Sequence, residues 1–316
     1  MGPLCSSLPV ALASELLDAA LDAILVHTPE GHLVYFNEAA SARMGLSREE
    51  FAALGPFGWV APEARPRRAD LTEALATTGH ARFESVSVHK DGHRTPVEVF
   101  ARLVESPDGP LVVSVARDIS ERVKAEEQLR HMALHDQLTG LANRALLDEQ
   151  LVTAMSNAHR HGDLLGVAYV DLDDFKHVND RHGHAFGDQV LMVAAERLRM
   201  CVRKSDIVAR LGGDEFVVLL PRLKRPADLE RAARKIVNAM RDPIYVEGHR
   251  VSLTTSVGLA LYDAIRDDAR SLLIRADLAM YAAKREGANR FRFSEAPDAI
   301  SAPCGYAPLA EPAAVP

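Results

Sequence analysis

Residues 207–220 read IVARLGGDEFVVLL, with one apolar run on either side of a Gly-Gly pair. Two such runs joined by glycines predict a β-hairpin with Gly212 and Gly213 at its turn. Because glycine has no Cβ atom, backbone N–H groups at this turn can come close to a bulky ligand. Asp214 and Glu215 follow directly and place two carboxylates beside the turn. Taken alone, the pattern is more often an ordinary surface turn than a binding site.

A second stretch points to a site. Residues 164–170 form a short apolar run that predicts a buried strand, and this strand leads into Asp171 and Asp173. A carboxylate at the end of a strand, beside a hairpin carboxylate, suits hard cations because they prefer oxygen ligands. With Mg²⁺ held by Asp171 and Asp214, and with Lys176 close by, nucleotide phosphates could bind. Each acid alone is more often a solvated loop residue, but together they predict a nucleotidyl-transfer site.

Four motifs in a fixed order make this chain resemble the GGDEF-domain diguanylate cyclases. They are DQLTGLANR at 136–144, DLDDFKHVND at 171–180 followed by GH and GD pairs, GGDEF at 212–216 and RADLAMYAAK at 275–284. The resemblance implies an α+β fold over residues 135–293, with a ferredoxin-like palm similar to that of nucleotide cyclases.

The implied reaction condenses two GTP into cyclic di-GMP and two pyrophosphates, by attack of a 3′-hydroxyl on an α-phosphate. The implied ligands of Mg²⁺ (or Mn²⁺) are Asp171, the Leu172 carbonyl and Asp214. Asp171 and Asp214 are also the expected catalytic residues, together with Glu215, a weaker candidate for metal or base contacts. Two cations about 3.5–4 Å apart can activate the attacking hydroxyl and neutralise the leaving pyrophosphate.

The resemblance also implies how GTP is held. Asn179 and Asp188 are the expected guanine readers. A carboxylate that accepts two N–H groups of guanine rejects adenine, so Asp188 favours GTP over ATP. The other implied contacts are to phosphate and to the bulk of the nucleotide, from Phe175, Lys176, Gly212, Gly213 and Lys284.

One position departs from the family. Ala288 stands where many members have an arginine that touches phosphate. That contact is either lost or supplied by Arg285 or Arg290. The departure bears on the affinity for GTP and leaves the predicted chemistry in place.

Residues 203–206 read RKSD and resemble the RxxD site that binds the product in this family. Arg203 can pair with a phosphate and stack on guanine, while Asp206 can accept a guanine N–H. Arg234 is a possible partner arginine. The plain alternative is an Arg–Asp pair on the surface, but the spacing from the GGDEF motif favours inhibition by cyclic di-GMP.

Residues 12–118 resemble a PAS sensor domain, preceded by a segment of residues 1–11. Asn37 is expected to cap a helix after the second strand. Asp-Gly pairs between alternating runs predict hairpins, and in the first of these runs Val86 and Val88 are expected to form the buried face, with Ser85 and Ser87 facing water. The expected strands are 23–27, 33–35, 82–89, 95–104 and 111–117.

The ligand of the PAS domain is not defined by the sequence. No cysteine lies between Cys5 and Cys201, which excludes flavin chemistry through a cysteine adduct. Haem would need a histidine ligand, and each candidate is more often a surface residue. The candidates are His27, His80, His89 and His93.

Residues 119–134 predict a charged connecting helix, because they lack Gly and Pro and contain many helix formers. Ala125, Leu129 and Met132 form a narrow apolar stripe on it. Two interpretations stay open: a solvated helix that rests on its neighbours, or a helix that pairs with its copy in a dimer. The second fits a reaction that needs two GTP-loaded units face to face in a homodimer.

Composition limits the partners and the compartment. The net charge of −7 argues against a nucleic-acid polymer, so an anionic nucleotide would need a local positive site or bound cations. No apolar run is long enough to insert into a membrane, and the N-terminus does not resemble a secretory signal. Three scattered cysteines favour a reducing cytoplasm. The Ala- and Pro-rich tail, residues 294–316, is expected to be disordered.

Three function classes stay open on these grounds. The leading one is a PAS-regulated diguanylate cyclase. A non-catalytic receptor for GTP or cyclic di-GMP is the second, and the intact acids at 171, 214 and 215 argue against it. A PAS scaffold with an inactive output domain is the third. No histidine spacing suggests a zinc site.

Overall fold

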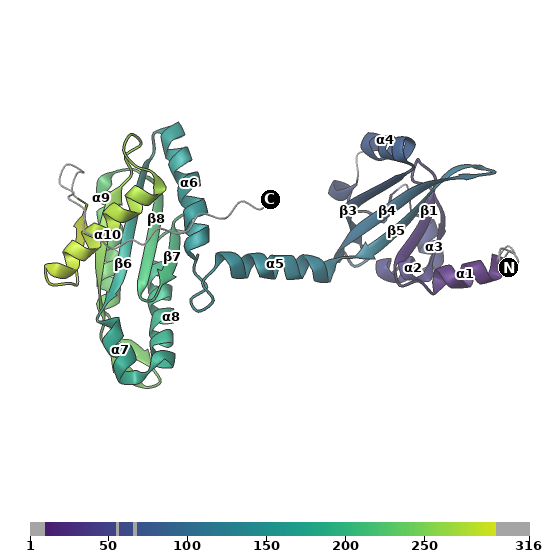
Figure 1. The fold of residues 1–316 in the computed structure, drawn as a ribbon. Helices are drawn as coiled ribbons and strands as arrows, with labels where there is room; N and C mark the ends of the chain where they lie inside the picture. Colours follow the sequence, from purple (N-terminus) through teal and green to yellow (C-terminus); the bar gives the residue numbers. More distant parts are fainter. Residues whose placement is uncertain (1–9, 55–56, 66–67, 295–316) are drawn as a thin grey trace, which may run out of the picture. The chain divides into compact units, whose positions relative to one another are not determined.

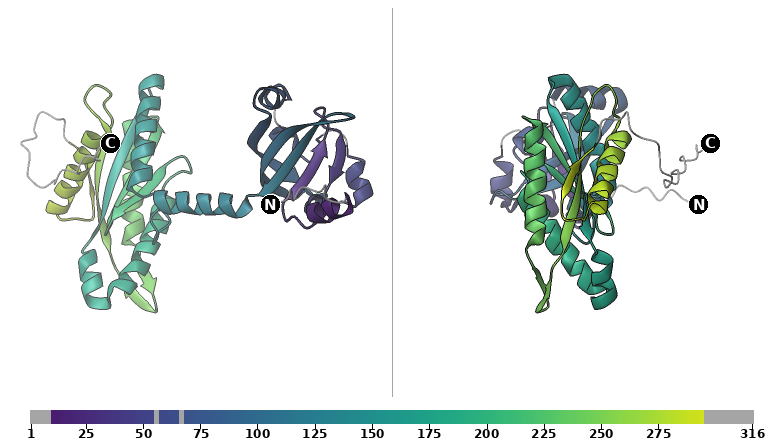
Figure 2. Two further views of the ribbon diagram at one scale, coloured as in Figure 1. Left: turned by 45° about the vertical axis from the view of Figure 1, so that its right-hand side comes forward. Right: turned by 90° about the vertical axis from the view of Figure 1, so that its left-hand side faces the viewer.

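The computed structural model describes residues 10–54, 57–65 and 68–294, and the chain divides into two compact units, Met1–Leu129 and Arg130–Pro316 (Figures 1 and 2). The predicted α+β class is confirmed, with an antiparallel sheet and flanking helices in the first unit and a mixed sheet in the second. The predicted tail lies outside the described residues apart from Ser294, and so does most of the segment 1–11.

The first unit is built on five antiparallel strands in the order β2-β1-β5-β4-β3. The long hairpins β3–β4 and β4–β5 form where the Asp-Gly pairs predict them. The strands are β1 Ala23–His27, β2 Leu33–Phe36, β3 His80–Val88, β4 Arg94–Ser106 and β5 Gly109–Asp118.

Helices and a short connecting segment cover one face of this sheet, where Leu25, Met44, Phe51 and Trp59 form the core. Asn37 caps α2 as predicted, since its Oδ1 accepts from the Ala40 N–H. The described helices are α1 Val10–Asp18, α2 Glu38–Met44, α3 Arg48–Ala52, the 3₁₀ turn η1 Pro62–Ala64 and α4 Arg68–Thr78.

The expected faces of β3 are wrong. Ser85 and Ser87 are buried, with 6% and 4% of their surface exposed, while Val86 and Val88 are only half-buried. The reversal comes from the β3–β4 register, which turns the serines toward the same side as the covered core. These serines line an internal cavity, which explains why small polar side chains replace large apolar ones there.

Helix α5, Ser120–Leu134, follows β5 and has no buried residue. Leu129 is 61% exposed and Met132 is 50% exposed, so the predicted apolar stripe is open to solvent in the single chain. No helix in the described part of the protein is long and apolar enough to cross a membrane.

The second unit has a five-stranded sheet in the order β12-β11-β6-β8-β7, and a separate ribbon of β9 and β10. All pairs are antiparallel except β11 with β12. The strands are β6 Leu164–Asp173, β7 Ile207–Gly212, β8 Glu215–Leu223, β9 Ile244–Val246, β10 His249–Val251, β11 Thr254–Leu261 and β12 Phe291–Phe293.

Helices cover both faces of this sheet, so β6 is buried along nearly its whole length. In Figure 2 the green α9 and the yellow α10 lie on opposite sides of the strands. Helices α8 and α9 pack on one face, and α6 and α10 on the other. The helices are α6 Arg144–His161, α7 Phe175–His182, α8 His184–Cys201, α9 Pro226–Arg241 and α10 Ala269–Arg285.

Candidate active site

The predicted hairpin forms and meets the end of β6. Asp171 lies directly opposite Glu215 in the β6–β8 ladder, and the Leu172 N–H donates to the Asp214 carbonyl at 3.3 Å. The structure therefore brings together the four residues that the sequence predicts around the metal. At the turn, Gly213 has φ +50° and no atom lies within 4 Å of where a Cβ would be, so the turn is open to a ligand.

Asp171 is a buried acid with few partners. Only 5% of the residue is exposed, and its Oδ1 lies 2.6 Å from Nζ of Lys284 in an ion pair that does not meet hydrogen-bond geometry. Burial raises the pKa of Asp171 to about 6; the neighbouring Asp214 and Glu215 charges also raise it, and Lys284 opposes the rise. The carboxylate is thus short of positive charge.

Asp173, two residues further along β6, has the opposite surroundings. It is also buried, yet its oxygens accept from Thr254 Oγ1 at 2.6 Å, Ser256 Oγ at 2.7 Å and the Asn289 N–H at 3.1 Å. Asp173 therefore fastens β6 to β11 and to the chain after α10. Of the two acids at this strand end, only Asp171 is left for a ligand.

The residues present fit a divalent cation. Among the described residues no three Asp, Glu, His or Cys side chains are grouped as a metal-ligand set. The predicted set, however, counts two carboxylates, Asp171 and Asp214, and the Leu172 carbonyl. A buried carboxylate oxygen without a hydrogen bond, with the charges of Asp214 and Glu215 close by, is a suitable ligand for a hard cation.

A second part of the site lies at α7 and α8. Asn179 Oδ1 is buried and has no hydrogen-bond partner among the described residues. A Cβ on Gly187 would lie 1.9 Å from this oxygen, so the approach requires glycine. This explains why a glycine stands at position 187 inside α8. Asp188 follows it and is exposed.

The start of α7 offers free N–H groups. The first N–H groups of a helix have no partner within it, and in α7 these belong to Phe175 and Lys176. The Lys176 side chain is exposed beside them. Asp174, the N-cap residue of α7, has φ +58° and makes no capping hydrogen bond.

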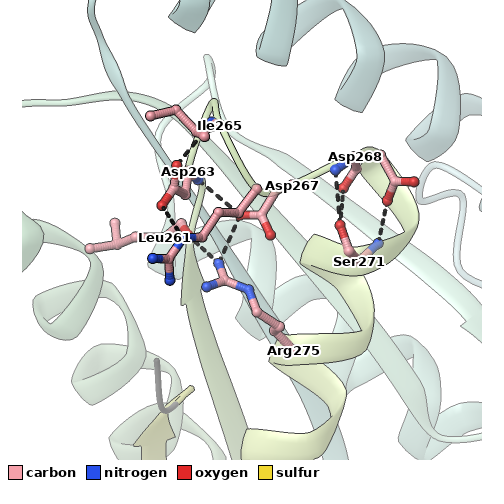
Figure 3. Close-up of polar contacts among 8 residues, drawn as sticks. Leu261, Asp263, Ile265, Asp267, Asp268, Ser271 and Arg275 are labelled. Atoms are coloured by element: carbon pink, nitrogen blue, oxygen red, sulfur yellow. Dashed lines mark hydrogen bonds and ion pairs between the residues drawn. The ribbon is translucent and has the colours of Figure 1, made fainter. Parts of the chain in front are cut away.

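Helix α10 supplies Lys284 and is firmly anchored at its start (Figure 3). Arg275 pairs with the buried Asp267 at 2.9 Å and also donates to the Leu261 carbonyl. Asp268 and Ser271 form a capping box at the N-terminus of the helix. The loop before α10 is thereby fixed to β11, and this fixes the position from which Lys284 reaches Asp171.

Three side chains at the site were missed by the sequence analysis. Tyr169 OH donates to Glu215 Oε2 at 3.0 Å. Asp277 lies on α10, on the same helical face as Lys284. Burial raises the pKa of Asp277, and the negative charge of Glu215 raises it further. Arg210 on β7 is the third, and it contacts Asp136 and Gly213. The alternation of β6 could have shown that Tyr169 shares a face with Asp171.

Arg210 connects the opening motif to the hairpin turn. Its Nη1 lies 3.1 Å from both carboxylate oxygens of Asp136, and its Nε and Nη2 donate to the Gly213 carbonyl at 3.0 and 2.9 Å. The Asp136 carboxylate also accepts from the Thr139 N–H and hydroxyl. The Gly-Gly turn is therefore linked, through Arg210 on β7, to Asp136 outside the hairpin.

Ala288, the position that departs from the family, has a left-handed φ of +54°. Its N–H reaches the carbonyls of Ala283 and Lys284 at the end of α10. Arg290, one of the two suggested substitutes, donates to the Ala288 carbonyl and lies 3.7 Å from Glu286. The side chain of Arg290 thus contacts residues 286–288, directly before it in the chain.

The predicted inhibitory residues fall into two places. The Asp206 carboxylate accepts from the Arg203 backbone N–H at 2.9 Å, and the exposed Arg203 guanidinium makes no described ion pair. The two therefore do not form the surface pair considered as the alternative. Arg234 lies on α9, paired with Glu230 at 2.6 Å and over the ring of Phe291. Arg203 lies in the loop between α8 and β7, whereas Arg234 lies on α9, so the two come from different elements of the second unit.

The first unit contains a cavity of about 40 Å³, partly open, between the sheet and its covering segments. His27 is buried, with Nδ1 2.8 Å from the Thr28 carbonyl and Nε2 3.1 Å from Ser114 Oγ. A carbonyl only accepts, so Nδ1 carries the proton. The lining residues are Ala23, Leu25, His27, Met44, Phe57, Trp59, Val60, Phe83, Ser85, Ser87, Val97, Val99, Ser114 and Ala116.

Of the four histidines considered as haem ligands, only His27 lines this cavity. Burial lowers the pKa of His27, so the ring is neutral near pH 7. A volume of this size has room for about three water-sized spheres.

The two units match two known domain families. Residues 133–290 match the sequence profile of the family described as "Diguanylate cyclase, GGDEF domain", and residues 21–121 match that described as "PAS domain". The chain belongs to the GGDEF diguanylate cyclase family.

Similar proteins come from bacteria. The bifunctional diguanylate cyclase/cyclic di-GMP phosphodiesterase MucR of Pseudomonas aeruginosa is 42% identical over 199 residues, which are 63% of this chain and 28% of MucR. The diguanylate cyclase TpbB of the same species is 46% identical over 171 residues, 54% of this chain and 39% of TpbB. The chain thus spans well under half the length of these relatives.

Solved structures resemble the second unit. The GGDEF domain of TpbB has a TM-score of 0.50 at 46% identity and covers 51% of this chain and 94% of that one. The coiled coil and GGDEF domain of DgcB from Caulobacter crescentus, solved in complex with c-di-GMP, has a TM-score of 0.51 at 32% identity, covering 55% of this chain and 92% of that one.

Proposed function

We propose that this protein is a diguanylate cyclase that condenses two GTP into cyclic di-GMP and two pyrophosphates. The observation that carries the proposal is the buried carboxylate of Asp171, where β6 meets the Asp214–Glu215 hairpin. Negative charges surround this carboxylate, and Lys284 opposes them. Membership of the GGDEF family and the identity to TpbB support it.

Asp171, the Leu172 carbonyl and Asp214 would hold Mg²⁺ or Mn²⁺. When bound, such cations supply Lewis-acid activation of a hydroxyl and charge neutralisation for pyrophosphate. Glu215 stands beside Asp171 and is placed to accept a proton or to complete the ligand set. Lys284 adds a positive charge at Asp171 that is also available to a phosphate.

Guanine would be read at α7 and α8. The unpartnered Oδ1 of Asn179 can accept an N–H of the base, and the exposed carboxylate of Asp188 can accept two. The free N–H groups of Phe175 and Lys176 and the open Gly212–Gly213 turn leave room and donors for phosphate.

The reaction requires two GTP-loaded units, so the proposal includes a homodimer. The exposed Leu129 and Met132 on α5 support a pairing of this helix with its copy. Product inhibition is part of the same proposal. The exposed guanidinium of Arg203, which makes no described ion pair, is available to a phosphate of the product, and Arg234 is the proposed second arginine.

Regulation by the PAS domain is the last part of the proposal. Ser114, which bonds His27 in the cavity, lies on β5, and β5 leads into α5. A small neutral molecule that competes for this hydrogen bond would act on the strand that precedes the connecting helix. Deletion of residues 1–118 is expected to abolish the response to such a ligand.

The test is the purified chain with GTP and Mg²⁺, assayed for cyclic di-GMP beside Asp214→Ala. We expect product from the wild type, and at least about a hundredfold less from the variant because a metal ligand is lost. Binding of GTP without any product would favour the receptor function, which the alanine at position 288 supports. Absence of Mg²⁺-dependent GTP binding would favour a scaffold.

A further inference from the structure

Tyr169 lies deep in the site, on the face of β6 that carries Asp171. Residues two apart on a strand point to the same side, so the phenol and the Asp171 carboxylate share the face covered by α6 and α10. Only 5% of Tyr169 is exposed. Its ring packs in the core while its hydroxyl reaches the polar end of the strand.

The hydroxyl ends on Glu215. Tyr169 OH lies 3.0 Å from Glu215 Oε2. Since Glu215 stands opposite Asp171 in the β6–β8 ladder, Tyr169 is the diagonal neighbour of Glu215 across this strand pair. A phenol near pH 7 is a neutral donor. The phenol can therefore orient the Glu215 carboxylate by a hydrogen bond and leave its negative charge in place. That charge is needed to bind a cation or to accept a proton.

We propose that Tyr169 is a positioning residue for Glu215. The hydrogen bond to Oε2 fixes the orientation of the carboxylate and leaves Oε1 for a divalent cation or for the attacking hydroxyl. The inference rests on the proposed function for the role of Glu215, and it adds a residue that none of the sequence motifs points to. Side chains that orient a ligand in this way commonly change metal affinity or activity by about 10–100-fold when removed.

The first experiment compares Tyr169→Phe with the wild type. This change removes the hydroxyl and keeps the ring that packs in the core. We expect the Mg²⁺ concentration for half-maximal rate to rise about tenfold, with little change in thermal stability. Tyr245→Phe is the matched control, because Tyr245 is 69% exposed on β9 and lies outside the site.

A second readout does not depend on turnover. Binding of Mn²⁺ to the full chain is followed by electron paramagnetic resonance, with 3′-deoxy-GTP present because it lacks the attacking hydroxyl. Weaker Mn²⁺ binding by Tyr169→Phe than by Tyr245→Phe supports the inference. If the wild type makes no cyclic di-GMP, the proposed function fails, but this titration still decides the role of Tyr169.

A double-mutant cycle separates positioning from damage to the fold. If Tyr169 acts through Glu215, the Tyr169→Phe change has no further effect on Mn²⁺ binding in a Glu215→Gln background. An equal loss in both backgrounds would show a structural role and overturn the inference. Mn²⁺ binding and rate within twofold of the wild type in Tyr169→Phe would overturn it as well.

Discussion

The two units each bury a titratable group in a polar cluster, and the two clusters differ in kind. At the end of β6, Asp171 is surrounded by the charges of Asp214 and Glu215 and has one cation, Lys284, to oppose them. In the PAS cavity, both ring nitrogens of His27 have neutral hydrogen-bond partners. The Asp171 cluster carries more negative than positive charge. In the His27 cluster both ring nitrogens are hydrogen-bonded, and most of the side chains that line the cavity are apolar.

This difference gives the two groups opposite pH dependences. The pKa of Asp171 is raised to about 6 from 3.8, so the native state holds its proton more tightly and loses stability as pH rises from 3.8 through 6. The pKa of His27 is lowered from 6.5, so its stability is present above pH 6.5 and is lost as pH falls. At neutral pH the buried charge of Asp171 therefore lowers the stability of the second unit, whereas the neutral ring of His27 does not lower that of the first.

The largest expected effect is on activity, at Asp171. Asp171→Asn removes the charge that holds a cation and should lower cyclic di-GMP synthesis by about a thousandfold or more, since metal ions contribute several kcal/mol at a transition state. The same variant, without metal at pH 7.5, should unfold at a higher temperature than the wild type, because the buried charge is gone. A gain below about 3 kcal/mol is expected from the two pKa units involved.

We therefore expect the wild type to be more active than Asp171→Asn but less stable without metal. Activity is measured by the product assay, and stability by thermal unfolding followed with circular dichroism. Asp171→Asn that is both active and destabilised would mean that Asp171 is a structural acid and would remove the contrast between the two clusters.

The second effect is on stability, at Asp173. Asp173→Asn weakens three hydrogen bonds to a buried carboxylate, each worth about 1.5–3 kcal/mol when the acceptor is charged. We expect the second unit to lose roughly 3 kcal/mol, because part of each bond survives with the amide oxygen. The measurement is urea unfolding with metal absent. A variant as stable as the wild type would show that Asp173 and Asp171 are not distinguished by their partners.

The third effect is at Arg210, which joins Asp136 to the Gly213 carbonyl. Arg210→Gln keeps a donor but loses the planar pair of contacts, so the turn beside Asp214 is held less firmly. We expect about a tenfold lower kcat with GTP at saturation, from loss of positioning. Arg222→Gln, at the far end of β8, is the matched control and should retain the wild-type rate.

The smallest expected effect is on the stability of the first unit, at His27, and it can be followed by tryptophan fluorescence. The single tryptophan of the chain, Trp59, lies in the PAS core with its ring 5.8 Å from that of His27, so tryptophan fluorescence follows the first unit alone. We expect the free energy of unfolding of the first unit, measured with urea, to be lower at pH 5.5 than at pH 7.5 by about 1 kcal/mol, the size of one buried hydrogen bond. His27→Asn should flatten this dependence, and an unchanged slope would assign it to another group.

Several features could be read directly from residue order. The Gly-Gly hairpin, the strand that ends in Asp171 and the cap at Asn37 follow from local pattern, because turns and caps depend on neighbours in sequence. The motifs placed the chain in a family, and the profile match over residues 133–290 agrees; which acids act together at the site stays a prediction. The three PAS hairpin strands were found for the same local reason.

Other features depended on packing between distant segments. Ser85 and Ser87 looked like a solvent face, but the β3–β4 register and the covering segment turned them inward. Asp171 and Asp173 look equivalent in sequence, yet only the second meets Thr254 and Ser256 from β11. Which of two like residues is satisfied cannot be known until the partner strand is placed.

The sequence by itself determined the glycine turn, the two carboxylates that follow it and the buried strand that ends in Asp171, since hydrophobic period and turn chemistry are local properties. That these two segments meet was implied by the resemblance to the GGDEF family. Only the tertiary structure decided which carboxylate lacks partners, that Tyr169 holds Glu215, and that the PAS cavity carries a neutral histidine. Those facts depend on side chains brought together from more than 40 positions apart, such as Tyr169 with Glu215 and His27 with Ser114, and long-range register alone sets such contacts.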